Sequence, residues 1–232
     1  MVLLIVALLL GGLLPTVSSQ VDQRRVSETR KQLDEIQQAL IGFAITNGRL
    51  PCPAAPNTTG VESSNPTVGV CTNLYDGFVP AATLGLSGAD SSGYAVDAWG
   101  NRIHYAVTAW SSNTFTTPNG MSNKGISNLI SLPDLLVCST ATGIISNACS
   151  GTTSLTPNGV PAVIFSTGKN GPQGNGVDET ANLDGTNANN NRTFVSHTYT
   201  PPSSPNGEFD DLVIWISTNT LINRMVAAGA LP

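Results

Sequence analysis

The stretch that decides the fold is MVLLIVALLLGGLLPTVSSQVDQRRVSETRKQLDEIQQALIGFAITNG, residues 1–48. It carries no charge before Asp22, and residues 1–14 are apolar apart from two glycines. From Asp22 onward, apolar residues recur every three or four positions, which is the spacing of an amphipathic helix. The expected apolar stripe consists of Val26, Leu33, Ile36, Leu40 and Phe43, with Thr29 in the remaining slot. The pattern predicts one long helix whose first half is apolar and whose second half lies on a globular head.

The helix is expected to end at Asn47-Gly48, because both residues tolerate the left-handed conformation that terminates helices. Two prolines follow within five residues and would prevent the helix from resuming. Pro15 stands at the junction between the two halves. The chain therefore divides into three parts: an apolar half-helix at 1–21, an amphipathic half-helix at 22–48 and a β-rich head at 49–232.

The apolar half is consistent with insertion in a membrane. Residues 1–14 would extend about 21 Å as a helix, against a bilayer core of about 30 Å. Counting on to Val21 reaches a spanning length through polar residues that suit an interface. Two alternatives stay open: a cleaved signal peptide, although the usual basic n-region is missing, and a helix buried in the core. The unbroken amphipathic continuation favours the inserted helix.

The composition limits the classes of function. The chain has 232 residues, of which 11% are charged and 40% are hydrophobic, so it can bury a core. Its 15 acidic and 10 basic residues give a net charge of −5 without a basic run, which argues against nucleic acid as the main partner. Low charge together with 23 glycines and 15 prolines indicates a loop-rich, exported protein.

The head contains several short runs with strand character. Residues 102–109 alternate between apolar and polar, and further runs occupy 135–138, 162–166 and 193–197. Residues 212–216, LVIWI, are continuously apolar, which predicts a central strand buried on both faces. Ser217 or Thr218 is placed to cap a short final helix.

Four cysteines lie in the head, and three pairings of them are conceivable. We favour Cys52–Cys71 and Cys138–Cys149, because each closes a loop that has no core of its own. Loops of that size gain about 3 kcal/mol from closure. A zinc site is the alternative, but CxxC spacing is absent and the two histidines are remote in sequence.

Five segments together resemble type IV pilin-like proteins, in particular the pseudopilins of type II secretion systems. The resemblance is strongest over the first 50 residues and is carried further by Ala39–Ala44, Asn47–Pro51, Asp97–Arg102 (DAWGNR), Phe165–Gly171 (FSTGKNG) and Asp210–Val213. It implies an α+β fold in which a long N-terminal helix packs on a small antiparallel sheet with disulfide-pinned loops.

The resemblance also implies a role. The chain would be a structural subunit, a pseudopilin or minor pilin, of an inner-membrane-anchored filament that drives protein export. The head would lie in the periplasm or in an extracellular filament. Implied partners are other pilin-like subunits, the inner-membrane assembly platform and secreted cargo proteins. Gly11 and Gly12 would permit close contact between the helices of neighbouring subunits, next to Pro15.

The printed sequence lacks the basic leader, the glycine and the Phe-Thr-Leu-Ile-Glu stretch of pilin-like precursors. We therefore assign no processing or methylation residue. We expect either a start upstream of Met1 or a divergent member of the family.

The resemblance further implies a calcium loop, since the major pseudopilin binds calcium near its C-terminus. The matching region is residues 168–184, where Asp178, Glu179 and Asp184 would supply oxygen ligands. The spacing is not that of an EF-hand, and the alternative is a solvated acidic loop. Asp210 and Asp211 are expected to cap a turn before the final strand.

Two other classes of function compete with the filament subunit. A secreted hydrolase would use His104 or His197, but the sequence has no nucleophile elbow, HExxH motif or phosphate loop, so we predict that the chain is not an enzyme. A pilus-tip adhesin or exported binding module on the same scaffold would use the long polar loops for recognition. The adhesin alternative stays open.

Overall fold

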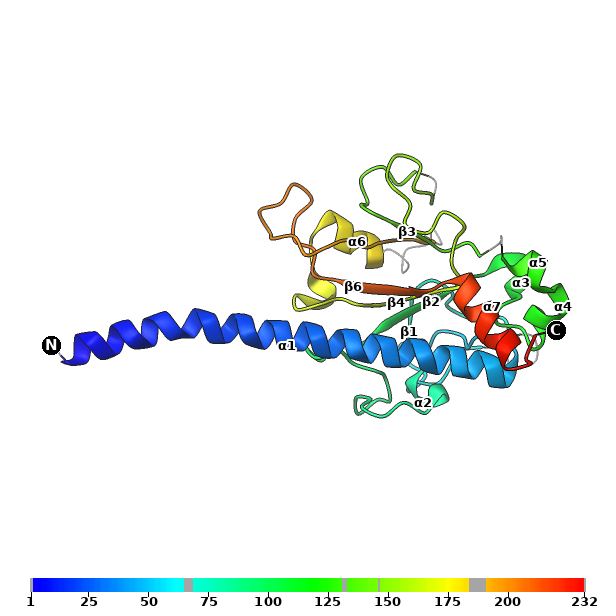
Figure 1. The fold of residues 1–232 in the computed structure, drawn as a ribbon, viewed down its shortest axis with the longest axis horizontal. Coiled ribbons are helices and arrows are strands. Elements are labelled where there is room, and N and C mark those ends of the chain that lie inside the picture. Colours follow the sequence, from blue (N-terminus) through cyan, green and yellow to red (C-terminus); the bar gives the residue numbers. More distant parts are fainter. Residues whose placement is uncertain (1, 65–68, 131–132, 146, 184–190, 232) are drawn as a thin grey trace.

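The computed structural model describes the backbone of residues 2–64, 69–130, 133–145, 147–183 and 191–231, and the side chains in these ranges from Ser19 onward. A single helix, α1 (Val2–Asn47), forms a rod of 46 residues, and its C-terminal half lies along a β-rich head (Figure 1). The prediction of one unbroken helix is confirmed. Among the described residues, no helix is both long enough and apolar enough to cross a membrane.

The C-terminal half of α1 packs through the predicted apolar stripe. Thr29, Leu33, Ile36 and Leu40 of that stripe are buried, and its members Val26 and Phe43 are half-buried. Ile41 and Ala44, which the predicted stripe did not include, are buried as well. The Thr29 hydroxyl accepts a hydrogen bond of 3.1 Å from the Ala98 amide, so even the polar member of the stripe is paired. The helix stops where expected, because Gly48 adopts a φ of 65° and its amide bonds to the Ala44 carbonyl at 2.9 Å.

The main sheet is antiparallel in the order β1-β2-β4-β6. Its strands are β1 (Gly77–Phe78), β2 (His104–Val107), β4 (Ala162–Ser166) and β6 (Leu212–Ile216). Helix α1 covers one face, and a smaller parallel pair, β3 (Leu136–Cys138) with β5 (Thr193–Val195), covers the other. The structure is therefore a mixed α/β head on a long helix.

The remaining elements are short and lie around the two sheets (Figure 1). They are α2 (Ala81–Leu84), α3 (Trp110–Asn113), α4 (Gly120–Lys124), α5 (Ile126–Leu129), the 3-10 turn η1 (Gly171–Gln173), α6 (Val177–Leu183) and α7 (Thr218–Ala227). Helix α7 begins as predicted, since the Ser217 hydroxyl accepts a hydrogen bond of 3.1 Å from the Thr220 amide.

The prediction that residues 212–216 form a central strand is wrong in one respect. Strand β6 pairs only with β4 and forms an edge of the sheet. Its side chains nevertheless pack on both faces, with Leu212, Ile214 and Ile216 against the α1 core and Val213 and Trp215 against the β3–β5 core. A continuous apolar run indicates that both faces of a strand are covered. It does not indicate whether the strand has a hydrogen-bonded neighbour on each side.

The two disulfides join Cys52 to Cys71 and Cys138 to Cys149, which confirms the pairing predicted from loops that have no core of their own. The first holds the segment after α1 against the head, and the second closes a loop that follows β3. Each bond removes conformational entropy from the unfolded chain.

Replacing Cys52 and Cys71 together by serine should lower the free energy of unfolding by about 3 kcal/mol, because the unfolded chain regains the entropy of the open loop. Urea unfolding followed by circular dichroism measures the loss. The matched Cys138→Ser/Cys149→Ser protein closes a shorter loop and should lose slightly less. A Cys52→Ser/Cys71→Ser protein as stable as the oxidised parent would contradict the prediction.

Candidate functional site

An acidic cluster lies where the first turn of α6 meets the start of β6. Glu179 comes from α6, and Asp210 and Asp211 immediately precede β6. One carboxylate oxygen from each of the three residues lies within 4.8 Å of the others. Glu179 and Asp211 are buried, and Asp210 is half-buried. The cluster therefore gathers three acids in a partly dehydrated place.

Hydrogen bonds fix the three carboxyl groups. The Asn170 side-chain amide donates to both oxygens of Glu179 at 2.9 and 3.1 Å, and the Asp210 amide donates to Glu179 at 2.9 Å. One oxygen of Asp210, Oδ2, accepts from the Lys169 and Asn170 amides at 2.9 and 3.1 Å. The Asn182 side-chain amide donates to Asp211 Oδ2 at 2.7 Å. The geometry of the cluster is thus set by backbone and amide donors.

The electrostatics of the cluster are unfavourable for three free carboxylates. Burial, followed by the charge of Glu179, raises the pKa of Asp210 to about 6. Burial raises the pKa of Asp211 well above its ordinary value, and the charges of Glu179 and Asp210 add to the shift. The folded head therefore favours either protons or a cation at this place.

The donor set fits a hard cation such as calcium. Asp210 Oδ1 and Asn170 Oδ1 are both buried without a hydrogen-bond partner among the described residues. With Glu179 and Asp211 they are oxygen donors of the kind calcium prefers. At Gly174, an added Cβ would come within 2.3 Å of Glu179 Oε2 and 3.0 Å of Asn170 Oδ1, so a larger residue there would crowd both oxygens.

The predicted calcium residues are only partly brought together. Glu179 belongs to the cluster, Asp184 lies outside the described residues, and Asp178 points elsewhere. Neighbouring residues on a helix project about 100° apart, so Asp178 and Glu179 cannot share one site easily. Asp210 and Asp211, expected only as turn caps, supply the carboxylates that the loop was expected to supply.

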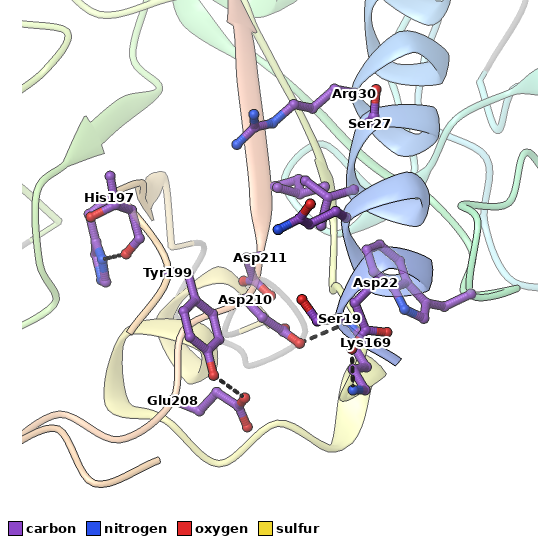
Figure 2. A pocket seen from close by; sticks show the side chains of 15 residues that line it. Ser19, Asp22, Ser27, Arg30, Lys169, His197, Tyr199, Glu208, Asp210 and Asp211 are labelled. Atoms are coloured by element: carbon purple, nitrogen blue, oxygen red, sulfur yellow. Dashed lines mark hydrogen bonds and ion pairs between the residues drawn. The ribbon is translucent and has the colours of Figure 1, made fainter. Parts of the chain in front are cut away.

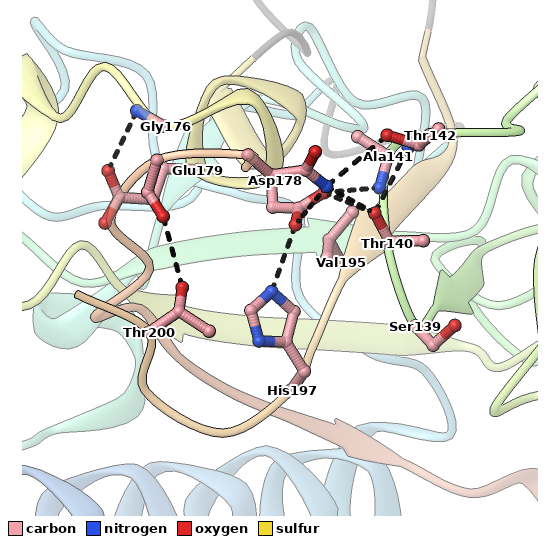
Figure 3. Close-up of polar contacts among 12 residues, drawn as sticks. Ser139, Thr140, Ala141, Thr142, Gly176, Asp178, Glu179, Val195, His197 and Thr200 are labelled. Carbon is pink, nitrogen blue, oxygen red and sulfur yellow. Dashed lines mark hydrogen bonds and ion pairs between the residues drawn. The ribbon is translucent and has the colours of Figure 1, made fainter. Parts of the chain in front are cut away.

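Asp178 organises a separate polar network (Figure 3). Its Oδ1 accepts from the Thr140 hydroxyl at 2.9 Å and the Ala141 amide at 2.6 Å, and its Oδ2 from the Asn206 side chain at 3.1 Å. His197 Nε2 lies 3.1 Å from the same Oδ2. Burial is the largest single influence on the pKa of Asp178 and would raise it. The hydrogen bonds together outweigh burial, so the pKa is lowered. Asp178 therefore ties the loop after β3 to α6.

The two histidines each stack on a phenylalanine ring. His104 is buried and stacks on Phe165 with ring centroids 4.7 Å apart, and burial lowers its pKa to about 4. His197 stacks on Phe209 at 3.9 Å, and its Nδ1 lies 2.7 Å from the Thr198 carbonyl oxygen. Both ring nitrogens of His197 thus face oxygen acceptors of the protein.

A cavity of about 700 Å³ opens next to the acidic cluster, between α1 and the head (Figure 2). An ion pair of 2.7 Å between Lys169 and Asp22 crosses one end of it and joins the head to the helix. Tyr199, which is 63% exposed, and Glu208 stand on the side opposite α1. Asp210 and Asp211 line the same cavity, so a cation at the cluster would be reached from it.

Comparisons with family models, curated proteins and solved structures find no match to this chain. The interpretation of the site therefore depends on its geometry and on the sequence.

In the metal-free protein, Asp210 should destabilise the fold as the pH rises. Its pKa is higher in the folded state, about 6, than in an unfolded chain, about 3.9, so the folded state binds more protons between these values. The free energy of unfolding should therefore fall from pH 4.5 to pH 7 by about 1–2 kcal/mol after allowance for solvent screening.

Urea unfolding in a chelator at several pH values tests this, with Asp210→Asn as the variant. The variant should lose less stability over the same interval, since asparagine does not titrate. Identical pH dependence in the two proteins would show that Asp210 is not the group responsible.

Proposed function

We propose that the protein is a structural subunit of a pilin-like filament, a pseudopilin or minor pilin, anchored in the bacterial inner membrane. The observation that supports this most directly is the form of α1. The helix has one half that packs on the head and another half that extends beyond it (Figure 1).

The extent of the projecting half suits a membrane or a filament core. Among the described residues, the Asp22–Lys169 ion pair joins α1 to the head, and the buried stripe begins at Thr29. Residues 2–21 therefore extend about 30 Å as a helix, which equals the thickness of a bilayer core.

The sequence of that half makes exposure to water costly. Its first 14 residues carry no polar side chain, and apolar surface costs about 25 cal/mol per Å² when it stays hydrated. In our proposal, lipid covers the apolar half of the free subunit and the helices of sibling subunits cover it in the filament. Gly11 and Gly12 are the positions at which such helices approach each other most closely.

The head belongs on the oxidising side of the membrane. Two disulfides join all four cysteines, and such bonds persist in the periplasm and outside the cell. We place the head in the periplasm or on the assembled filament, where it can meet the assembly platform and cargo proteins.

Within this function, the acidic cluster would hold calcium as a structural ion. Glu179, Asp210 and Asp211, with the Asn170 side-chain oxygen, are the residues that would bind it. Bound there, the cation supplies positive charge that joins α6, the loop at Lys169–Asn170 and the start of β6 beside α1.

A charge introduced in the apolar half tests the anchor. Leu9→Lys should release the protein from membranes on carbonate washing, because a lysine near the middle of an inserted helix costs about 2.5–3.5 kcal/mol. Gln23→Lys on the amphipathic half is the matched control and should leave the membrane fraction unchanged. Equal retention of both proteins in membranes would contradict the anchor.

The same two variants separate the filament from the adhesin. In cells that lack the chromosomal copy, Gln23→Lys should restore export of other proteins, and Leu9→Lys should not. Surface attachment that changes while export stays intact would instead favour the pilus-tip adhesin.

Calcium should raise the melting temperature of the head in a saturable manner, because the ion binds only the assembled cluster. Glu179→Gln and Asp211→Asn should abolish the shift, whereas Asp34→Asn, on the exposed face of α1, should retain it. Differential scanning fluorimetry with calcium against magnesium measures the effect. An unchanged shift in the Asp211→Asn protein would exclude the cluster as the site.

A further inference from the structure

The two sheets have four outer edges, and three of them are covered by the chain itself. At β1, Ala54 exchanges two backbone hydrogen bonds of 2.8 and 2.9 Å with Phe78. At β3, the Leu155 amide and the Thr156 hydroxyl bond to Val137. At β5, the Asn182 side chain bonds both the amide and the carbonyl of Val195, at 2.7 and 3.1 Å. Each covered edge thus has partners for its main-chain groups.

The fourth edge belongs to β6, and it is the open one. The Thr108 amide donates to the Pro161 carbonyl, so the main chain at Pro161 faces β2. In an antiparallel strand every second residue faces the same neighbour, so the main-chain groups of Val163 and Phe165 also face β2. The groups of Ala162, Ile164 and Ser166 then face β6 and pair with Ile216, Ile214 and Leu212. Val213 and Trp215 consequently direct their amides and carbonyls outward.

Along that edge, the described residues supply one hydrogen bond. Gln37 of α1 donates its side-chain amide to the Trp215 carbonyl at 2.9 Å. The bond joins an amide N–H to a main-chain carbonyl, as in a pair of strands, but here the donor is a side chain and not a neighbouring strand. The Val213 amide and carbonyl and the Trp215 amide remain directed outward. Leu212–Trp215 are all half-buried and uncharged, so the edge has none of the charges that usually protect one.

Cavities lie at both ends of this edge. The cavity of about 700 Å³ begins at Leu212 and lies between α1 and the segment that follows β5 (Figure 2). The cavity is lined by α1, by residues 197–199 after β5 and by Leu212, so it lies at the end of the sheet where β6 begins. A second cavity of about 180 Å³ lies at Trp215, with the exposed side chains of Ile130 and Leu155 around it.

We propose that the β6 edge binds an extended segment of another polypeptide, which adds to the main sheet as a fifth strand. Main-chain hydrogen bonds to Val213 and Trp215 would supply the affinity. The side chains of the incoming segment would enter the two cavities. Four carboxyl groups line the Leu212 end against the two cations Arg30 and Lys169, so this end suits a basic residue. The Trp215 end suits an aromatic or large aliphatic residue. This binding does not depend on the filament role.

A second copy of β6 is a poorer occupant. If two copies paired antiparallel about Ile214, Thr218 of the second copy would stand opposite Asp210. Helix α7 begins at that threonine, so a helix would follow where the large cavity requires extended chain. A foreign segment that remains extended past Leu212 fits both cavities.

The probe is the acetylated and amidated peptide Phe-Thr-Ile-Thr-Val-Lys, whose order matches antiparallel addition with lysine at the Leu212 end. Its phenylalanine and lysine point to opposite faces of the strand, as Trp215 and Leu212 do. We expect saturable binding by titration calorimetry and slower hydrogen exchange at the Val213 and Trp215 amides on binding. The peptide of reversed order is the matched control and should bind at least tenfold more weakly. Failure of the forward peptide to bind, or Val213 and Trp215 amides as protected in the free protein as that of Ile214, overturns the proposal.

Two changes test the edge itself. Val213→Pro removes an outward amide and no bond to β4, so it is tolerated at an edge and should reduce peptide binding at least tenfold. Gln37→Ala frees the Trp215 carbonyl and should tighten binding. Unchanged binding in a folded Val213→Pro protein refutes the proposal.

If the Val213→Pro protein does not fold, N-methylated peptides provide a second test of main-chain hydrogen bonding to β6. Methyl groups on the amides that face β6 should abolish binding, and methyl groups on the alternate amides should not. Equal effects of the two peptides refute the proposal. Dimerisation of the free protein that Val213→Pro abolishes would overturn the choice of a foreign segment in favour of a second copy.

Discussion

The burial of one apolar stripe on α1 is the constraint on which the rest of the structure depends. Leu33, Ile36, Leu40 and Ala44 are buried and join residues of β2, β4, β6 and α7 in one core. Most helical stability in proteins comes from packing of an apolar face rather than from the helix's own hydrogen bonds. The sheet therefore fixes the direction of the rod, and the rod in turn closes one face of the sheet.

The position of the candidate site follows from that packing. Helix α1 leaves the head near Thr29, and the cavity occupies the angle between the departing helix and the start of β6. The ion pair between Asp22 and Lys169 crosses this angle, and Lys169 is directly bonded through its amide to Asp210. The acidic cluster is thus linked through Lys169 to an ion pair between the head and α1.

The long helix, its stop, the strand segments and the disulfide pairing could be predicted because each is encoded by local pattern or spacing. The place of β6 in the sheet could not, since LVIWI reports burial of side chains and says nothing of hydrogen bonds in the plane of the sheet. The acidic cluster was missed for a related reason. Glu179 and Asp210 are 31 residues apart in sequence, and only the antiparallel return of the chain brings them together. The prediction that Asp178 joins Glu179 in one site was wrong, because adjacent side chains on a helix point in different directions.

The acidic cluster and the open edge of β6 share one structural element, and this links their behaviour. Asp210 and Asp211 immediately precede Leu212, so any ligand that fixes the two carboxyl groups also fixes the first residue of the edge. Without a cation, burial and the neighbouring charge of Glu179 raise the pKa of Asp210 and of Asp211, so ionisation of the two groups is unfavourable at this junction. A cation removes that repulsion, and it also removes negative charge from the end of the groove. Occupancy of the cluster should therefore order the edge while it weakens attraction for a basic residue there, and the balance between these two effects decides whether a cation and an added strand assist or exclude each other.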